Sequence, residues 1–102
     1  MNGITINKLK ELNNVHIIDI RDNYSYTKSH LDNAINIPYY SLINNYSMYL
    51  NKNEVYCFYC DFSHQSQSLS NMLNALGYKT YYLIEGYLEY KVNNYNKRKF
   101  LD

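Results

Sequence analysis

The hydrophobic and polar residues of this chain fall into alternating blocks, and each block has the period of a strand or of a helix. Compact apolar runs predict strands at 15–20, 34–37, 54–59 and 79–83. Apolar residues three or four positions apart, as at Leu69, Met72, Leu73 and Leu76, predict helices between the strands. We expect these helices at 6–12, in the polar segment 22–29, and at 40–50, 67–76 and 87–95, with Thr5 capping the first.

The alternation of strands and helices indicates an α/β protein. Strands that are apolar on both faces are typical of a parallel sheet covered by helices on both sides, which is a three-layer α/β/α architecture. The 102 residues contain no internal repeat or linker, so we expect a single domain over residues 1–102.

Charge and hydropathy narrow the class of function. The formal net charge of +1 gives no electrostatic reason to expect nucleic acid, an acidic partner or a membrane surface. The N-terminus lacks the basic segment of a signal peptide, and no apolar run approaches the roughly 18–20 residues that span a membrane. We therefore expect a cytoplasmic protein whose two cysteines are reduced or catalytic rather than joined in a structural disulfide.

Cys60 stands out because it lies between a predicted strand and a predicted helix. The strand ends at this cysteine, and a short polar loop separates it from the helix. Unpaired backbone N–H groups and the positive end of the helix dipole converge at such a place and favour an anion, either a thiolate or a bound oxyanion. Cys60 is therefore the candidate nucleophile.

Four segments, taken in order, carry motifs of one known family. The longest comprises the strand, Cys60, a loop closing on Ser66, and a helix ending in Leu76-Gly77-Tyr78. The others are residues 17–21 (IIDIR), 29–38 (SHLDNAINIP) and 83–90 (LIEGYLEY). They resemble the rhodanese-homology domains, whose patterns are C-x-x-G-x-R-[S/A] before a helix ending in L-G-[Y/F], I-D-V-R, G-H-I-x-G-A-I-N-I-P and L-x-G-G-x-x-x-W. The resemblance covers nearly the whole chain and implies a central, mainly parallel sheet of five strands.

The resemblance also implies a sulfurtransferase. In this family the cysteine accepts a sulfane sulfur as a persulfide, a ring of backbone N–H groups holds the terminal sulfur, and a thiophilic acceptor then takes it. For this sequence, the resemblance implies that Cys60 is catalytic and that neither a cofactor nor a metal is required. The expected partners are a small-molecule sulfur donor or a protein persulfide, and a thiol or cyanide acceptor. The implied substrate-binding residues are Asp61, Phe62, Ser63, His64, Gln65 and Ser66.

Two positions of this loop depart from the family pattern. Ser63 stands where the family commonly has glycine, and a positive φ there would cost a non-glycine residue about 1 kcal/mol or more. Gln65 stands where the family commonly has arginine, so residues 61–66 contain no Lys or Arg. We therefore expect weak capture of the thiosulfate dianion, and a persulfide as the better donor.

Two other functions remain open from the sequence. The cell-cycle phosphatases that share this fold have a similar loop, C-E-F-S-S-E-R, but Ser66 replaces the final arginine that clamps the phosphate. The other alternative is a sulfur carrier or persulfide sensor, which holds sulfur for a partner with little turnover of its own.

Cys57 and Cys60 form a C-x-x-C pair, which in other proteins marks a redox pair or half of a zinc site. In a strand, residues three apart point to opposite faces and lie about 10 Å apart, beyond the roughly 7 Å limit for a disulfide. We therefore expect Cys57 to be a buried core thiol. His16, His30 and His64 lack the paired spacing of a zinc site, so we expect no metal.

Asp19 and Arg21, near the end of the first predicted strand, are interpreted as structural rather than catalytic. The resemblance implies that these positions belong to a network that secures the loops near the active site. The acidic residue that the family often places four positions after this arginine is Ser25 here, so Arg21 must pair with Asp19, Asp22 or a distant carboxylate. His30 is likewise expected to be a structural hydrogen-bonding residue rather than a base.

Overall fold

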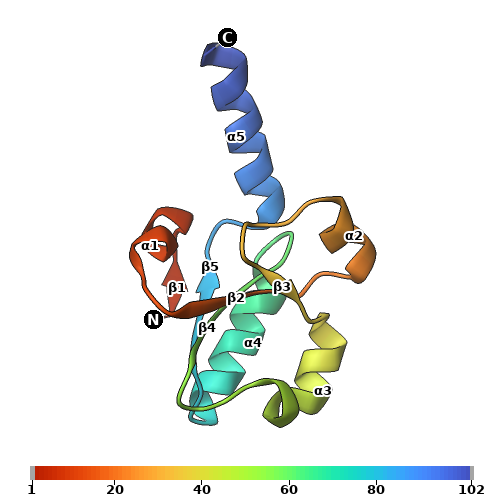
Figure 1. Ribbon diagram of the computed structural model, residues 1–102, viewed down its shortest axis with the longest axis vertical. Coiled ribbons are helices and arrows are strands. Elements are labelled where there is room, and N and C mark those ends of the chain that lie inside the picture. Colours follow the sequence, from red (N-terminus) through yellow and green to blue (C-terminus); the bar gives the residue numbers. More distant parts are fainter. Residues whose placement is uncertain (1, 102) are drawn as a thin grey trace.

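The structure is a computed structural model, which describes residues 2–101 and their side chains as far as Tyr95. Within that part of the chain, five parallel strands form one sheet in the order β1-β5-β4-β2-β3 (Figure 1). The predicted α/β class and parallel five-stranded sheet are confirmed. The strands are β1 (Gly3–Ile4), β2 (Val15–Asp19), β3 (Ile35–Asn36), β4 (Val55–Tyr59) and β5 (Lys79–Leu83).

Helices cover both faces of the sheet. They are α1 (Ile6–Glu11), α2 (Asn23–Lys28), α3 (Tyr39–Tyr49), α4 (His64–Ala75) and α5 (Tyr87–Leu101). Successive side chains of β4 point to opposite faces. Phe58 therefore lies in one apolar cluster with residues of α3 and α4, whereas Tyr59 lies in a second cluster with residues of α1 and α5. The sheet thus separates two cores, as a three-layer architecture requires.

Several element boundaries differ from those expected. Residues 3–4 form the edge strand β1, which the apolar pattern did not reveal. α4 begins at His64 rather than after Ser66, so the loop that follows Cys60 is shorter than expected. α5 continues beyond Tyr95 to Leu101, and α3 is kinked at Asn45, where φ is −140° and ψ is 32°.

Side-chain caps set the beginnings of the two short helices α1 and α2. Thr5 accepts a hydrogen bond from the amide of Lys8 at 3.1 Å, which confirms the predicted cap. Asp22 caps α2 by accepting from the amide of Ser25 at 2.8 Å, and this bond holds the pKa of the Asp22 carboxyl below its usual range. The Asp22 carboxylate therefore keeps its negative charge at neutral pH.

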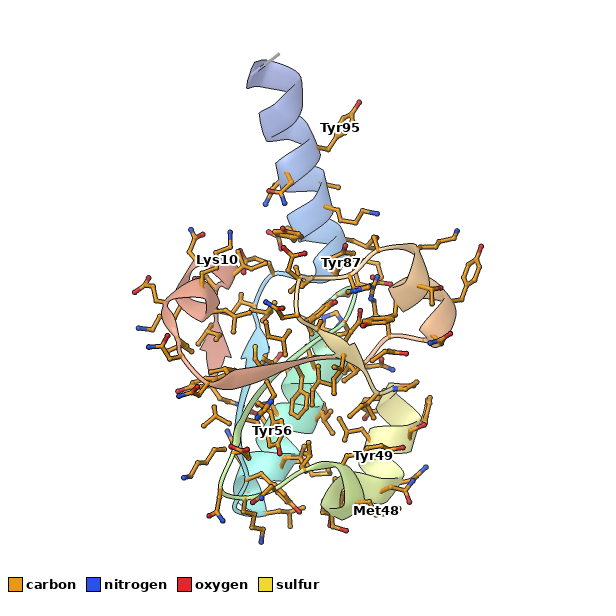
Figure 2. The ribbon with its side chains drawn as sticks, viewed as in Figure 1. Lys10, Met48, Tyr49, Tyr56, Tyr87 and Tyr95 are labelled. Carbon is orange, nitrogen blue, oxygen red and sulfur yellow. The ribbon has the colours of Figure 1, made fainter. Side chains whose placement is uncertain are left out.

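The carboxyl ends of the strands meet at one edge of the sheet because all five strands are parallel. Asp19 of β2 pairs with Tyr59 of β4, so the segments that follow these two strands leave the sheet side by side. α5 begins at this edge and extends away from the rest of the molecule (Figure 1). Figure 2 shows Tyr87 at the base of α5 and Tyr95 pointing outward from it.

No helix in the described part of the chain is both long enough and apolar enough to cross a membrane.

Candidate active site

Cys60 follows β4 directly and lies at the carboxyl edge of the sheet. Its side chain is only 6% exposed and packs in the apolar cluster on the α3 and α4 side. It also lines a cavity of about 400 Å³, a volume within the usual range of small-molecule sites. The cavity is formed by Ile20, Arg21, Asp22, Pro38, Tyr39, Tyr40, Cys60, Asp61, Phe62, His64 and Gln65.

The loop after Cys60 has three residues, Asp61 to Ser63, before α4 begins. Ser63 is the N-cap of α4 and adopts a φ of 72° and a ψ of −16°, in the left-handed region. Ser63 therefore adopts the positive φ that costs a non-glycine residue energy. The amides of residues 61–66 have no backbone acceptor in the part of the chain that the structure describes. Such free donors before and within the first turn of a helix stabilise an anion.

Ser66 is buried and contacts the cysteine directly. Its Oγ lies 3.4 Å from Cys60 Sγ and donates a hydrogen bond to the carbonyl oxygen of Ser63 at 3.0 Å. While its proton points to Ser63, the Ser66 oxygen can only accept from a protonated Cys60 thiol. Rotation of the hydroxyl converts Ser66 into a donor for a Cys60 thiolate.

The loop residues predicted to bind substrate play different parts in this geometry. Ser63 contributes a backbone turn and Ser66 a hydroxyl contact with the sulfur. The sequence did not predict that residues 20–22 and 38–40 also line the cavity. The parallel pairing of β2 with β4 brings residues 20–22 beside the Cys60 loop. The four predicted residues that line the cavity are Asp61, Phe62, His64 and Gln65.

The N-terminus of α5 holds the backbone of the loop in place. The amide of Tyr87 donates to the carbonyl oxygen of Cys60 at 2.9 Å, and the amide of Leu88 donates to that of Asp61 at 3.4 Å. Gly86 lies so close to the loop that a Cβ there would be 1.9 Å from the carbonyl oxygen of Asp61. Position 86 therefore has no room for a side chain, and this role was not foreseen from the sequence.

Arg21 joins the loop to the buried end of β2. Its Nη2 donates to Oδ2 of the fully buried Asp19 at 2.7 Å, and its Nη1 lies 3.4 Å from Oδ1 of Asp61. Burial opposes the positive charge, but the hydrogen bond and the charge of Asp19 prevail, so the pKa of Arg21 is raised. Asp19 and Arg21 thus form a buried network, as expected, and Asp61 is the distant carboxylate that the sequence could not identify.

The family follows from a comparison of the sequence with known families. The model described as rhodanese-like domain matches residues 5–93, which is most of the chain. This protein belongs to the rhodanese-like domain family. No functionally curated protein matches it.

Solved structures of rhodanese-like proteins are similar to this one over most of their length. A rhodanese-like domain protein from Staphylococcus aureus is 30% identical, with a TM-score of 0.70, over 84% of this chain and 87% of that one. A rhodanese-related protein from Thermoplasma volcanium is 22% identical, with a TM-score of 0.76, over 84% and 86% of the two chains. The human single-domain sulfurtransferase TSTD1 is 16% identical, with a TM-score of 0.74, over 88% and 95%. The last two likenesses show the shared fold.

The second cysteine of this rhodanese-like domain lies away from the cavity. Cys57 is fully buried in the cluster on the α1 and α5 side, on the opposite face of the sheet from the cluster that holds Cys60. Burial raises the pKa of the Cys57 thiol to about 12. The prediction that Cys57 is a core thiol is confirmed, and both cysteines are free.

The histidines of the described region give no metal site. His30 Nδ1 lies 2.7 Å from the carbonyl oxygen of Tyr26, and its ring stacks on the Tyr26 ring at 3.8 Å, which is a structural arrangement. Between residues 2 and 95, no three side chains of the metal-binding types gather closely enough to hold an ion.

Replacing Ser63 with glycine, the common residue in rhodanese-like loops, is expected to stabilise the protein. The Ser63 side chain makes no capping hydrogen bond, so the substitution removes the strain of the positive φ without removing such a bond. The gain of about 1 kcal/mol is partly offset by the flexibility of glycine in the unfolded chain. A rise in Tm of about 2–6 °C in a thermal melt would follow.

The matched control is Ser68→Gly, an exposed position inside α4, where glycine should lower Tm. A Ser63→Gly variant that melts no higher than the parent protein would show that the left-handed serine carries no strain.

Proposed function

We propose that this rhodanese-like protein is a sulfurtransferase in which Cys60 carries the sulfane sulfur as a persulfide. The proposal rests on one observation: Cys60 lines a cavity and directly precedes residues 61–66, whose amides have no backbone acceptor among the described residues. A persulfide places its negatively charged terminal sulfur one bond beyond Sγ, where such donors stabilise it. Cys60 must stay reduced for this chemistry, which favours the cytoplasm as the place of action.

Each half of the proposed reaction is a displacement at sulfur. The Cys60 thiolate attacks the sulfane sulfur of the donor, whose S–S bond breaks, and the leaving thiolate or sulfite takes the electron pair. The acceptor thiolate then attacks the terminal sulfur of the persulfide, and Cys60 Sγ leaves with the electron pair. Neither step needs an external oxidant or reductant. The Ser66 hydroxyl, 3.4 Å away, can donate to the Sγ thiolate once it rotates away from the carbonyl oxygen of Ser63.

The charges around Cys60 favour a persulfide over thiosulfate as the donor. Residues 61–66 contain no Lys or Arg, and Arg21 in the cavity wall is already paired with Asp19 and Asp61. A thiosulfate dianion would meet backbone dipoles, hydroxyls, Gln65 and His64, while Asp61 opposes it. A charged hydrogen bond is worth on the order of 1.5–3 kcal/mol, so its absence raises the KM for thiosulfate roughly ten- to a hundred-fold.

The variant Gln65→Arg is expected to improve the use of thiosulfate selectively, by roughly ten-fold in kcat/KM. Gln65 is exposed and lines the cavity, so an arginine there reaches the donor without entering the core. The measurement is kcat/KM for thiosulfate and for glutathione persulfide in both proteins.

Gln67→Arg is the control, because Gln67 is exposed on the same helix but does not line the cavity. A parent protein that already prefers thiosulfate, with no gain from Gln65→Arg, would mean that backbone amides suffice and that the charge argument is wrong.

Intact mass spectrometry tests the proposed function itself. After exposure to a sulfane-sulfur donor the protein should gain the mass of one sulfur atom and lose it again when a thiol or cyanide is added. Repeated cycles would indicate turnover, a single loading and release would indicate a sulfur carrier, and the absence of loading would contradict both. An aryl phosphate assayed in parallel should be hydrolysed negligibly, because Ser66 cannot clamp a phosphoryl group and Asp61 repels it.

A further inference from the structure

Carboxylates outnumber cations at the wall of the Cys60 cavity. Asp22 and Asp61 line it beside Arg21, and the Asp61 side chain is 35% exposed. The Arg21 guanidinium is already bound at 2.7 Å by the buried Asp19 and lies 3.4 Å from Asp61. Two carboxylates thus pair with one guanidinium, and the exposed Asp22 adds a further negative charge at the cavity wall. His64 is the one exposed imidazole that lines it.

Exposed aromatic rings lie among these carboxylates. Tyr40 is 71% exposed and Phe62 is 69% exposed, and both line the cavity. Tyr39 lies beside Tyr40, with ring centres 5.3 Å apart in an edge-to-face arrangement. The face of an aromatic ring attracts a cation, and this attraction adds to that of a neighbouring carboxylate. Such a wall suits an ammonium or guanidinium group better than an anion, because its own guanidinium, that of Arg21, is already paired with Asp19 and Asp61.

The sulfur end of the cavity has the opposite preference. At Cys60 the free amides of residues 61–66 favour a negatively charged sulfur. A ligand that satisfies both regions carries a thiolate at one end and a cation a few bonds away. We propose that the acceptor of the Cys60 sulfur is such a cationic thiol, an inference that rests on the proposed function and names the acceptor class for the same site. Its thiolate attacks the terminal sulfur, Cys60 leaves as a thiolate, and the product is the persulfide of the cationic thiol.

Three small thiols of different charge test this inference on protein whose Cys60 has first been loaded with sulfur. They are cysteamine, 2-mercaptoethanol and 3-mercaptopropionate, which are cationic, neutral and anionic. The second-order rate constant for sulfur removal is measured for each thiol at the same pH, about 8.5, where an ordinary imidazole is uncharged. Intrinsic differences between the thiols cancel when the cysteamine-to-mercaptoethanol ratio is compared between protein variants.

This ratio is expected to fall about five-fold in Asp61→Asn and in Asp22→Asn, because each removes one partly solvated attraction for the ammonium group. The corresponding ratio for 3-mercaptopropionate should rise. Asp32→Asn is the matched control: Asp32 is exposed and lines a different cavity, so both ratios should stay as in the parent protein. Added salt should lower the cysteamine ratio of the unaltered protein, a measurement that does not depend on the folding of any variant.

A peptide with a cysteine between two lysines is assayed in parallel with cysteamine, to distinguish a protein acceptor from a small-molecule acceptor. A higher rate for the peptide assigns the acceptor to a protein, and a higher rate for cysteamine assigns it to a small molecule. If Cys60 is loaded but the ratios change neither in the Asp61 and Asp22 variants nor with salt, this inference is overturned and the proposed function stands. Failure to load Cys60 at all would overturn the proposed function and the inference with it.

Discussion

Replacing Cys60 with serine is expected to abolish both sulfur loading and sulfur transfer. Cys60 is the thiol that lines the cavity and directly precedes the free amides of residues 61–66, and a serine hydroxyl in its place cannot form a thiolate. Intact mass spectrometry should show no loaded species. We expect kcat/KM for transfer to fall by about 10³-fold or more.

Cys57→Ala is the matched control for this experiment. Cys57 is fully buried in the other core, and burial keeps its thiol protonated near neutral pH by raising the pKa to about 12. Loading should persist, with a loss of about 1 kcal/mol in stability from the removed sulfur. Loading that survives in a folded Cys60→Ser variant, or that disappears in a folded Cys57→Ala variant, would refute the assignment of the persulfide to Cys60.

A single methyl group at position 86 is expected to lower the activity strongly, although less than Cys60→Ser does. In Gly86→Ala the new Cβ would lie 1.9 Å from the carbonyl oxygen of Asp61, so the loop must shift away from α5. The shift breaks the bonds from the amides of Tyr87 and Leu88 and displaces the loop amides relative to the Cys60 sulfur. A displacement of about 1 Å at a reacting centre costs on the order of 10²-fold in rate, and overpacking costs about 1–3 kcal/mol in stability.

Gly3→Ala controls for the loss of a glycine as such. Its Cβ would approach the end of the Tyr82 side chain at 2.8 Å, on the edge strand β1, where a flexible side chain can move aside. Gly3→Ala should therefore lower Tm with little change in the rate of transfer. If Gly86→Ala retained full activity, the contact between α5 and the loop would have no part in placing the amides.

The order of elements was predictable because β2, β4 and β5 are short apolar runs separated by helical spacing. β1 was not, since it has two residues and exists only through its pairing with β5, in which Gly3 lies opposite Tyr82. The start of α4 was placed too late for a different reason. Its first turn is polar, because the residues there face the cavity or the sulfur rather than the core, and a polar turn carries no apolar period.

The same distinction applies to the candidate site. Cys60 and its loop are contiguous, so their roles could be proposed from a single stretch of sequence. The contact of Arg21 with Asp61 joins residues 40 positions apart, and the one between Gly86 and the loop depends on where α5 starts. Contacts of this kind arise from the packing of the parallel strands and have no local signal.

The separation of the two cysteines decides how this protein responds to oxidants. They lie in different cores on opposite faces of the sheet, and the chain has no third. A peroxide that converts Cys60 to a sulfenic acid therefore leaves it without a resolving thiol in its own chain. Repair must come from a thiol on another molecule, and where none arrives the next oxidation, to the sulfinic acid, is irreversible. The supply of thiols around the protein thus governs its survival under oxidative stress.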